Sequence, residues 1–343
     1  MMNNTNTTVS NTTNLSVNTE MKDGYDLPVT GLASGYFYSL HSLALSCMFC
    51  SFVCAVIVLT FSYRAKTCRD FFKGWSKGER FIVYMALFDG SFNVFHSLDH
   101  LHYVIAMDHV RPKELCQFYA FVNVVFVNGQ NLMVNIVAFN AFMLMYFDKN
   151  LDFGKADWKL LTWIIGMPFV GASIAQFTGT LGPTGSFCLF DGVTGFTANV
   201  CLTTVPLLII VLMNSVMYGL TWKRIREKTK AVRHLNKVTR HTVSSSRRAA
   251  TSMSMFVVAF FIQWTPLAIM GVWLILDTEV PLVLFYIVTT FSNLGGCLNF
   301  VVFLIIRHRN RQQRSKNERG HHDSDEHKNM PTSSSITFVS TQT

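Results

Sequence analysis

The sequence predicts an all-α membrane protein, a bundle of seven transmembrane helices with its N-terminus outside the cell and its C-terminus inside. Half of the 343 residues are apolar and only 14% are charged, which is too little charge to coat a soluble domain. Seven long apolar stretches follow one another, and a helix needs about 20 such residues to cross a bilayer core. The clusters of Lys and Arg that flank these stretches fall on one predicted side of the membrane.

The expected spans form one domain, residues 35–306. They cover residues 35–63, 81–107, 115–147, 158–177, 197–222, 249–276 and 281–306. Basic segments follow the first, third, fifth and seventh spans, whereas acidic or neutral connections follow the others. Because cytoplasmic loops carry the excess of Lys and Arg, this alternation predicts that the N-terminus is outside.

Residues 1–34 are predicted to form an extracellular glycosylated tail. The segment lacks the basic leader and the apolar core of a signal peptide and is rich in Asn, Thr and Ser. Its glycosylation acceptor sequences begin at Asn3, Asn6, Asn11 and Asn14. The alternative is a polar tail that is never modified.

Residues 307–343 are predicted to form a cytoplasmic tail. Its basic beginning, residues 307–316, is expected to be a short amphipathic helix that lies on the inner leaflet against anionic membrane lipids. Serine clusters at residues 244–246 and 333–335 are candidates for phosphorylation, which would add negative charge and recruit arrestin.

The net charge of +9 does not indicate nucleic-acid binding, because the basic residues concentrate between two apolar spans. The loop 223–248 would bind a G protein or anionic lipid, or is basic only because of the topology. The sequence contains no Gly-rich phosphate loop, no His-Glu-x-x-His and no Gly-x-Ser-x-Gly. We therefore expect neither an enzyme nor a bound cofactor.

Motifs in three predicted spans are similar to those of one known family. Residues 85–89 read Met-Ala-Leu-Phe-Asp, residues 260–266 read Phe-Phe-Ile-Gln-Trp-Thr-Pro, and residues 295–303 read Gly-Gly-Cys-Leu-Asn-Phe-Val-Val-Phe. They resemble Leu-Ala-x-x-Asp, Phe-x-x-Cys-Trp-x-Pro and Asn-Ser-x-Leu-Asn-Pro-x-x-Tyr. Across residues 35–317 the chain thus resembles the rhodopsin-like (class A) G-protein-coupled receptors, as a divergent orphan member.

The resemblance assigns roles to residues inside the membrane. Asp89 and Asn299 would form a polar core between the second and seventh spans, since a carboxylate deep in a membrane usually marks a pathway or an ion site. The alternative for Asp89 is a helix-end acid that reaches the membrane surface. Phe260, Trp264 and Pro266 would form a switch: the proline kinks the sixth span, and the tryptophan senses the ligand from the pocket floor.

Further matches and departures follow from the same resemblance. Cys116 and Cys188 match the family's extracellular disulfide, which ties the second outer loop over the pocket. The family's Asp-Arg-Tyr triplet falls on residues 140–142, which read Asn-Ala-Phe. Two consequences are open: a resting state with basal activity, or weak or absent G-protein coupling. Phe300 replaces the proline of the seventh span, which should therefore be straighter there.

The ligand-binding candidates lie in the outer half of the bundle. Asn123 stands where amine receptors have Asp, and Asn293 stands where opsins have the retinal-binding Lys, so neither an amine nor retinal is expected. His96, Asp99 and His100 share one helical face. They would form a pocket wall for a peptide or an acid, a zinc site, a pH sensor, or interface histidines satisfied by water. We assign no metal.

The sequence thus predicts a multi-pass receptor of the cell membrane. A peptide or small polar molecule outside the cell would move the sixth span and so activate a heterotrimeric G protein. The alternatives are a seven-helix receptor that does not couple to G proteins, of a scavenger or atypical kind, and a transporter or channel.

Overall fold

The computed structural model describes residues 21–65, 68–231, 237–277 and 280–328. The acceptor sequences at Asn3, Asn6, Asn11 and Asn14 and the serines at 333–335 lie outside these ranges. Within them, six stretches of helix are long and apolar enough to cross a membrane. Two shorter helices, bent by 47° at a break, make a seventh if they form one span. The expected all-α membrane bundle is confirmed, whereas the side on which each end lies remains a prediction.

The helices correspond closely to the predicted spans. Four spans are single helices: α1 (Phe37–Ala65), α3 (Lys77–Ala106), α4 (Lys113–Tyr146) and α9 (Lys237–Leu276). The fourth span joins α5 (Trp158–Leu161) to α6 (Met167–Phe177), and the fifth joins α7 (Phe196–Asn199) to α8 (Val205–Ala231). The seventh consists of α10 (Leu282–Ser292) and α11 (Gly295–Lys328), and the short helix α2 (Phe71–Gly74) lies between α1 and α3.

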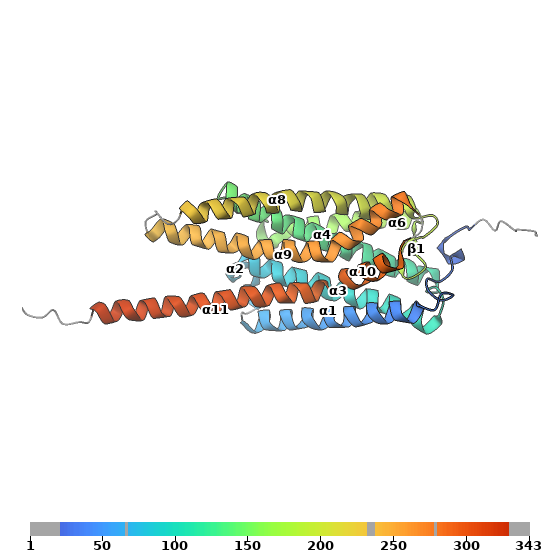
Figure 1. Cartoon of the computed structure of the whole chain (residues 1–343), viewed down its shortest axis with the longest axis horizontal. Coiled ribbons are helices and arrows are strands. Elements are labelled where there is room, and N and C mark those ends of the chain that lie inside the picture. Colours follow the sequence, from blue (N-terminus) through green and yellow to red (C-terminus); the bar gives the residue numbers. More distant parts are fainter. Residues whose placement is uncertain (1–20, 66–67, 232–236, 278–279, 329–343) are drawn as a thin grey trace, which may run out of the picture.

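The helices pack into a bundle in which α4 contacts four of the other long helices, α3, α6, α8 and α9. Helix α1 contacts α3 and α11, α4 contacts α3, α8 and α9, and α9 contacts α10 and α11. The first described residues and the end of α11 lie at opposite ends of the bundle (Figure 1), as an odd number of crossings requires. Because lipid cannot satisfy backbone groups, long helices pair them within each span.

Local sequence sets where the helices begin and bend. Helix α3 starts four residues earlier than predicted because Ser76 and Glu79 form a capping box. One wide π-helical turn, Thr162–Gly166, precedes Pro168 near the start of α6, and another, Val200–Thr204, precedes Pro206 near the start of α8. Proline has no N–H to donate to the preceding turn, and the wider turn accommodates that loss.

A short β-hairpin, which the sequence did not predict, joins the fourth and fifth spans. Strand β1 (Leu181–Pro183) pairs antiparallel with β2 (Cys188–Phe190), and Pro183 lies opposite Cys188. Gly185 in the connecting turn has a φ of +100°, a conformation that favours glycine. The described chain is therefore a helical bundle with one small sheet at the end that the predicted topology places outside the cell. This end is called the outer end, and the opposite end is called the inner end.

The seventh span bends, but not at Phe300, where the missing proline predicts a straighter helix. Helix α10 ends at Ser292 and α11 begins at Gly295, so the bend lies before the Asn299 motif. Helix α11 does run unbroken through Phe300, where the family proline is missing. It also continues to Lys328, because no Gly or Pro interrupts residues 307–319. Residues 307–316 are therefore helical and continuous with the seventh span, and their amphipathic contact with the inner leaflet stays a prediction.

Candidate functional site

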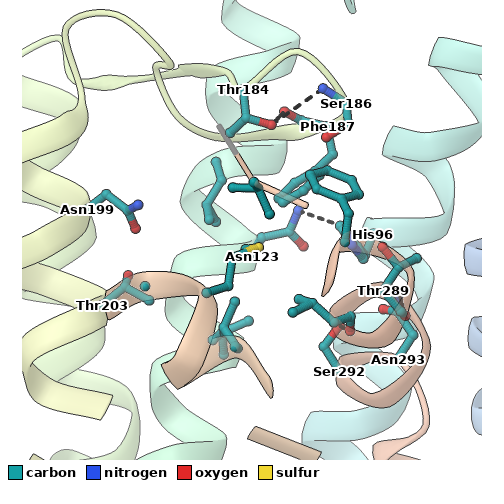
Figure 2. Close-up of a pocket in the computed structure, with 18 of the residues that line it drawn as sticks. His96, Asn123, Thr184, Ser186, Phe187, Asn199, Thr203, Thr289, Ser292 and Asn293 are labelled. Atoms are coloured by element: carbon teal, nitrogen blue, oxygen red, sulfur yellow. Dashed lines mark hydrogen bonds between the residues drawn. The ribbon is translucent and has the colours of Figure 1, made fainter. Parts of the chain in front are cut away.

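A cavity of about 410 Å³ lies in the outer half of the bundle, beneath the β-hairpin (Figure 2). Helices α1, α3, α4, α7, α8, α9 and α10 and the π-helical turn before α8 contribute to its wall. The hairpin covers it with Thr184, Ser186 and Phe187 (Figure 2). Its volume falls within the roughly 300–1,000 Å³ that is usual for small-molecule sites.

The structure brings four of the five predicted ligand-binding candidates to this cavity. His96 and His100 reach it from α3, Asn123 from α4, and Asn293 from the end of α10. Asp99 does not line it. Its Oδ2 atom instead accepts a hydrogen bond of 2.8 Å from the backbone N–H of Cys188, so Asp99 fixes the hairpin to α3.

The cavity wall carries little charge. None of the described residues that line it is Lys, Arg, Asp or Glu, and its polar groups are hydroxyls, carboxamides and two imidazoles. A charged ligand would leave water without a counter-ion, which costs several kcal/mol. The site therefore favours an uncharged molecule.

Three histidines form a buried cluster beside the cavity. His41 Nδ1 in α1 lies 2.8 Å from His100 Nδ1, and His96 Nδ1 lies 3.9 Å from Asp99 Oδ2. His96 and His100 are 7% and 3% exposed, so they are not interface histidines held by water. The described residues include no group of three or more His, Cys, Asp or Glu side chains placed to hold a metal. The zinc alternative therefore gains no support.

The predicted disulfide between Cys116 and Cys188 is confirmed. It joins the start of α4 to β2, and both cysteines are fully buried. Together with the bond from Cys188 to Asp99, it holds the hairpin over the cavity from two neighbouring helices.

The described residues before α1, 21–36, pack on the outer loops. Lys113 donates a 2.6 Å hydrogen bond to Asp23 and so lowers the pKa of that carboxyl, and Gly24 N–H donates to Asp191. Burial raises the pKa of Tyr25 to about 12, and its hydroxyl donates to the Val110 carbonyl. Two later residues of the segment, Thr30 and Tyr36, line the cavity.

A polar core lies below the cavity, at the bend of the seventh span. Asn299 Nδ2 donates to Asp89 Oδ2 at 2.7 Å, so the structure places the two predicted residues in contact. Ser51 in α1 accepts the N–H of Gly296 at 2.8 Å, and Gln263 Nε2 in α9 donates to the Ser292 carbonyl at 3.1 Å. These side chains satisfy backbone groups that the break leaves free within the membrane. The signalling role of Asp89 and Asn299 stays a prediction.

Gly295 has no room for a side chain in this core. A Cβ atom there would lie 2.9 Å from Asp89 Oδ1 and would also meet the Gln263 amide. We expect Gly295→Ala to destabilise the bundle by about 1–3 kcal/mol, since an added methyl must displace buried polar groups. The thermal midpoint of the purified protein in a fixed detergent measures this effect.

Gly219 provides a matched control, because it is exposed on α8 and a Cβ there would meet nothing within 4 Å. Gly219→Ala should stabilise the protein by about 0.5–1 kcal/mol through helix propensity. Equal midpoints for the two variants would show that the core tolerates a larger residue at Gly295.

The predicted switch residues lie between the cavity and the inner half of α9. Trp264 is 2% exposed and lines the cavity, and Phe260 packs one turn toward the inner end. Pro266 lies inside α9, which continues through it and changes direction along its length (Figure 1). The switch itself remains a prediction.

The inner end holds residues whose roles the sequence did not reveal. The residue at 141, where the family has Arg, is a buried Ala, and Asn140 Oδ1 accepts the N–H of Leu151 at 3.1 Å. Arg80 in α3 forms a buried ion pair with Asp157. Both segments carry several charges of either sign, so no signal in the sequence selects this pair.

Comparison with known proteins supports the fold. No protein-family model matches the chain, and no curated protein sequence matches it significantly. Among solved structures, squid rhodopsin matches with a TM-score of 0.64 and 15% sequence identity. The match covers 86% of this chain and 89% of squid rhodopsin. At this identity the likeness shows a shared seven-helix fold.

Proposed function

We propose that this protein is a cell-surface receptor of the rhodopsin-like, G-protein-coupled class. A small, uncharged molecule from outside the cell binds in the cavity and shifts the bundle between two states. The inner half of α9 then moves outward and opens a site for a heterotrimeric G protein. Arrestin would bind after phosphorylation, and anionic lipids would contact the basic inner surface.

One observation carries this proposal: Trp264 is part of the cavity wall and also belongs to α9. A ligand that contacts Trp264 acts directly on the helix that must move, next to the bend residue Pro266. Gln263 also joins α9 to the broken seventh span. A shift of α9 would therefore alter contacts in the polar core.

The second candidate is a seven-helix receptor that does not couple to G proteins. It is favoured by Ala141, which replaces the arginine that contacts the G protein in the family. The neighbouring residue, Asn140, accepts the N–H of Leu151 and so holds the loop that follows α4.

G-protein activation in cells that express the chain distinguishes the two candidates. We expect basal or ligand-evoked coupling in a screen of uncharged small molecules, with a large loss for Trp264→Ala. Trp273→Ala is the matched control, because Trp273 is on the same helix but 38% exposed. Signals are normalised to surface labelling of each variant. Absent coupling at normal surface levels, with partial coupling in Ala141→Arg, would contradict the proposal and support the second candidate.

A further inference from the structure

Two carboxamide oxygens in the cavity wall have no hydrogen-bond partner. They are Asn123 Oδ1 and Asn293 Oδ1. The two residues are 1% and 2% exposed, and they reach the cavity from different helices (Figure 2). A buried polar atom without a partner is costly and calls for an explanation, and at a cavity wall a ligand donor would supply one.

Neighbouring groups fix which end of each carboxamide is free. Asn293 Nδ2 donates to the Thr289 carbonyl at 2.8 Å. Asn123 Nδ2 lies 3.4 Å from His96 Nδ1 and 3.5 Å from the Cys188 carbonyl (Figure 2). A carbonyl oxygen only accepts, so it requires the NH₂ group and not the oxygen of each amide to face it. The free group at both positions is thus an acceptor.

Apolar side chains form much of the remaining wall. They include Phe92, Val124, Val127, Leu207, Trp264 and Leu267. These side chains would contact the hydrocarbon or aromatic part of a ligand, and the two acceptors would fix the orientation of that ligand.

We propose that the ligand is an uncharged, largely apolar small molecule that carries two hydrogen-bond donors, hydroxyl or amide N–H. One donor binds Asn123 Oδ1 and the other binds Asn293 Oδ1. This inference rests on the proposed function, which makes the cavity the receptor's ligand site. It disfavours acids and ammonium compounds, since no Lys, Arg, Asp or Glu side chain lines the described wall. A site built to pair with a donor also rejects the analogue that lacks it.

Binding to the full-length protein in lipid nanodiscs tests this ligand class. The probes are biphenyl-4,4′-diol, terphenyl-4,4″-diol and dodecane-1,12-diol, which differ in length and flexibility. Each is compared with its dimethyl ether and with analogues in which one hydroxyl is replaced by a carboxylate or an aminomethyl group. Affinities come from the dependence of the thermal midpoint on probe concentration.

We expect at least one diol to bind saturably, and its dimethyl ether to bind about tenfold more weakly or worse. Asn123→Leu and Asn293→Leu should each weaken the diol about tenfold without weakening the ether. Asn131→Leu is the control, because Asn131 is equally buried on α4 but does not line the cavity. Asn123→Asp, which keeps the side-chain shape, should shift the preference to the aminomethyl analogue.

Three results would overturn the inference: no diol binds, the ether binds as tightly as its diol, or a charged analogue binds the unmodified protein best. The assay reads binding without a G protein, so it separates the two proposals. A diol that binds but evokes no coupling contradicts the proposed function alone. A receptor that signals with other ligands but binds no diol contradicts this inference alone.

Discussion

Arg80→Ala should destabilise the folded bundle by about 3–5 kcal/mol, the usual cost of breaking a buried ion pair. Arg80 Nε donates to Asp157 Oδ2 at 2.6 Å and Nη2 donates to Oδ1 at 3.0 Å. The two side chains are only 10% and 4% exposed. Without the arginine, the Tyr84 hydroxyl is the only side-chain donor that remains on the Asp157 carboxylate among the described residues.

The ion pair also holds an unusual turn. Asp157 and Ala156 have φ values of 53° and 58°, in the left-handed region that residues other than glycine rarely adopt. The two bonds to Arg80 join this turn to the start of α3, which fixes the inner loop before α5. Loss of Arg80 should therefore loosen the loop as well as lower stability.

Thermal unfolding of the purified protein in one detergent measures the effect, and a second ion pair provides the control. Lys228 contacts Asp148 at 2.7 Å, but the Asp148 side chain is 72% exposed, so Asp148→Asn should cost less than about 1 kcal/mol. The double variant Arg80→Met with Asp157→Leu should recover most of the loss. A midpoint for Arg80→Ala equal to that of Asp148→Asn would show that the pair contributes little.

Cys188→Ser should have the second large effect, a loss of about 2–5 kcal/mol. The bond to Cys116 closes a loop of 72 residues, and its removal leaves the hairpin held by strand pairing and by Asp99. Because the hairpin covers the cavity, ligand affinity should fall together with stability. The thermal midpoint and the affinity for a cavity probe are measured on the same preparation.

Cys201→Ser is the control for this substitution, because Cys201 is a free, exposed cysteine near the start of the fifth span. It should change neither quantity. A Cys188→Ser protein with an unchanged midpoint and affinity would mean that the remaining contacts suffice to hold the hairpin.

The sequence predicted the helices well because membrane spans depend on residue composition along the chain. Apolar length and the placement of Lys and Arg are local signals, and they located every span. The fifth, sixth and seventh helices extend further at one end than predicted, to Ala231, from Lys237 and to Lys328. The bend in the seventh span was not predictable in the same way. It depends on Ser51 and Gln263, which lie far away in the sequence and satisfy the backbone where α10 ends.

The candidate site was only partly predicted, because it also depends on contacts between residues that are distant in the sequence. Comparison with the family's positions indicated Asn123 and Asn293, and a shared helical face indicated His96 and His100. Whether a polar side chain faces a cavity or another residue depends on the loop above it, however. Asp99 faces the backbone of Cys188, and His41 joins the cluster from α1, because of contacts that no single helix encodes.

The number of crossings is the point on which the whole account depends, because six helices are clear spans and the seventh is the bent pair α10 and α11. Different epitope tags before Met1 and after Thr343 test it, with antibody labelling of intact and permeabilised cells. We predict that the first tag is labelled on intact cells and the second only after permeabilisation. Labelling of both tags on intact cells, or of neither tag before permeabilisation, would place the two ends on one face and contradict the seven-helix receptor.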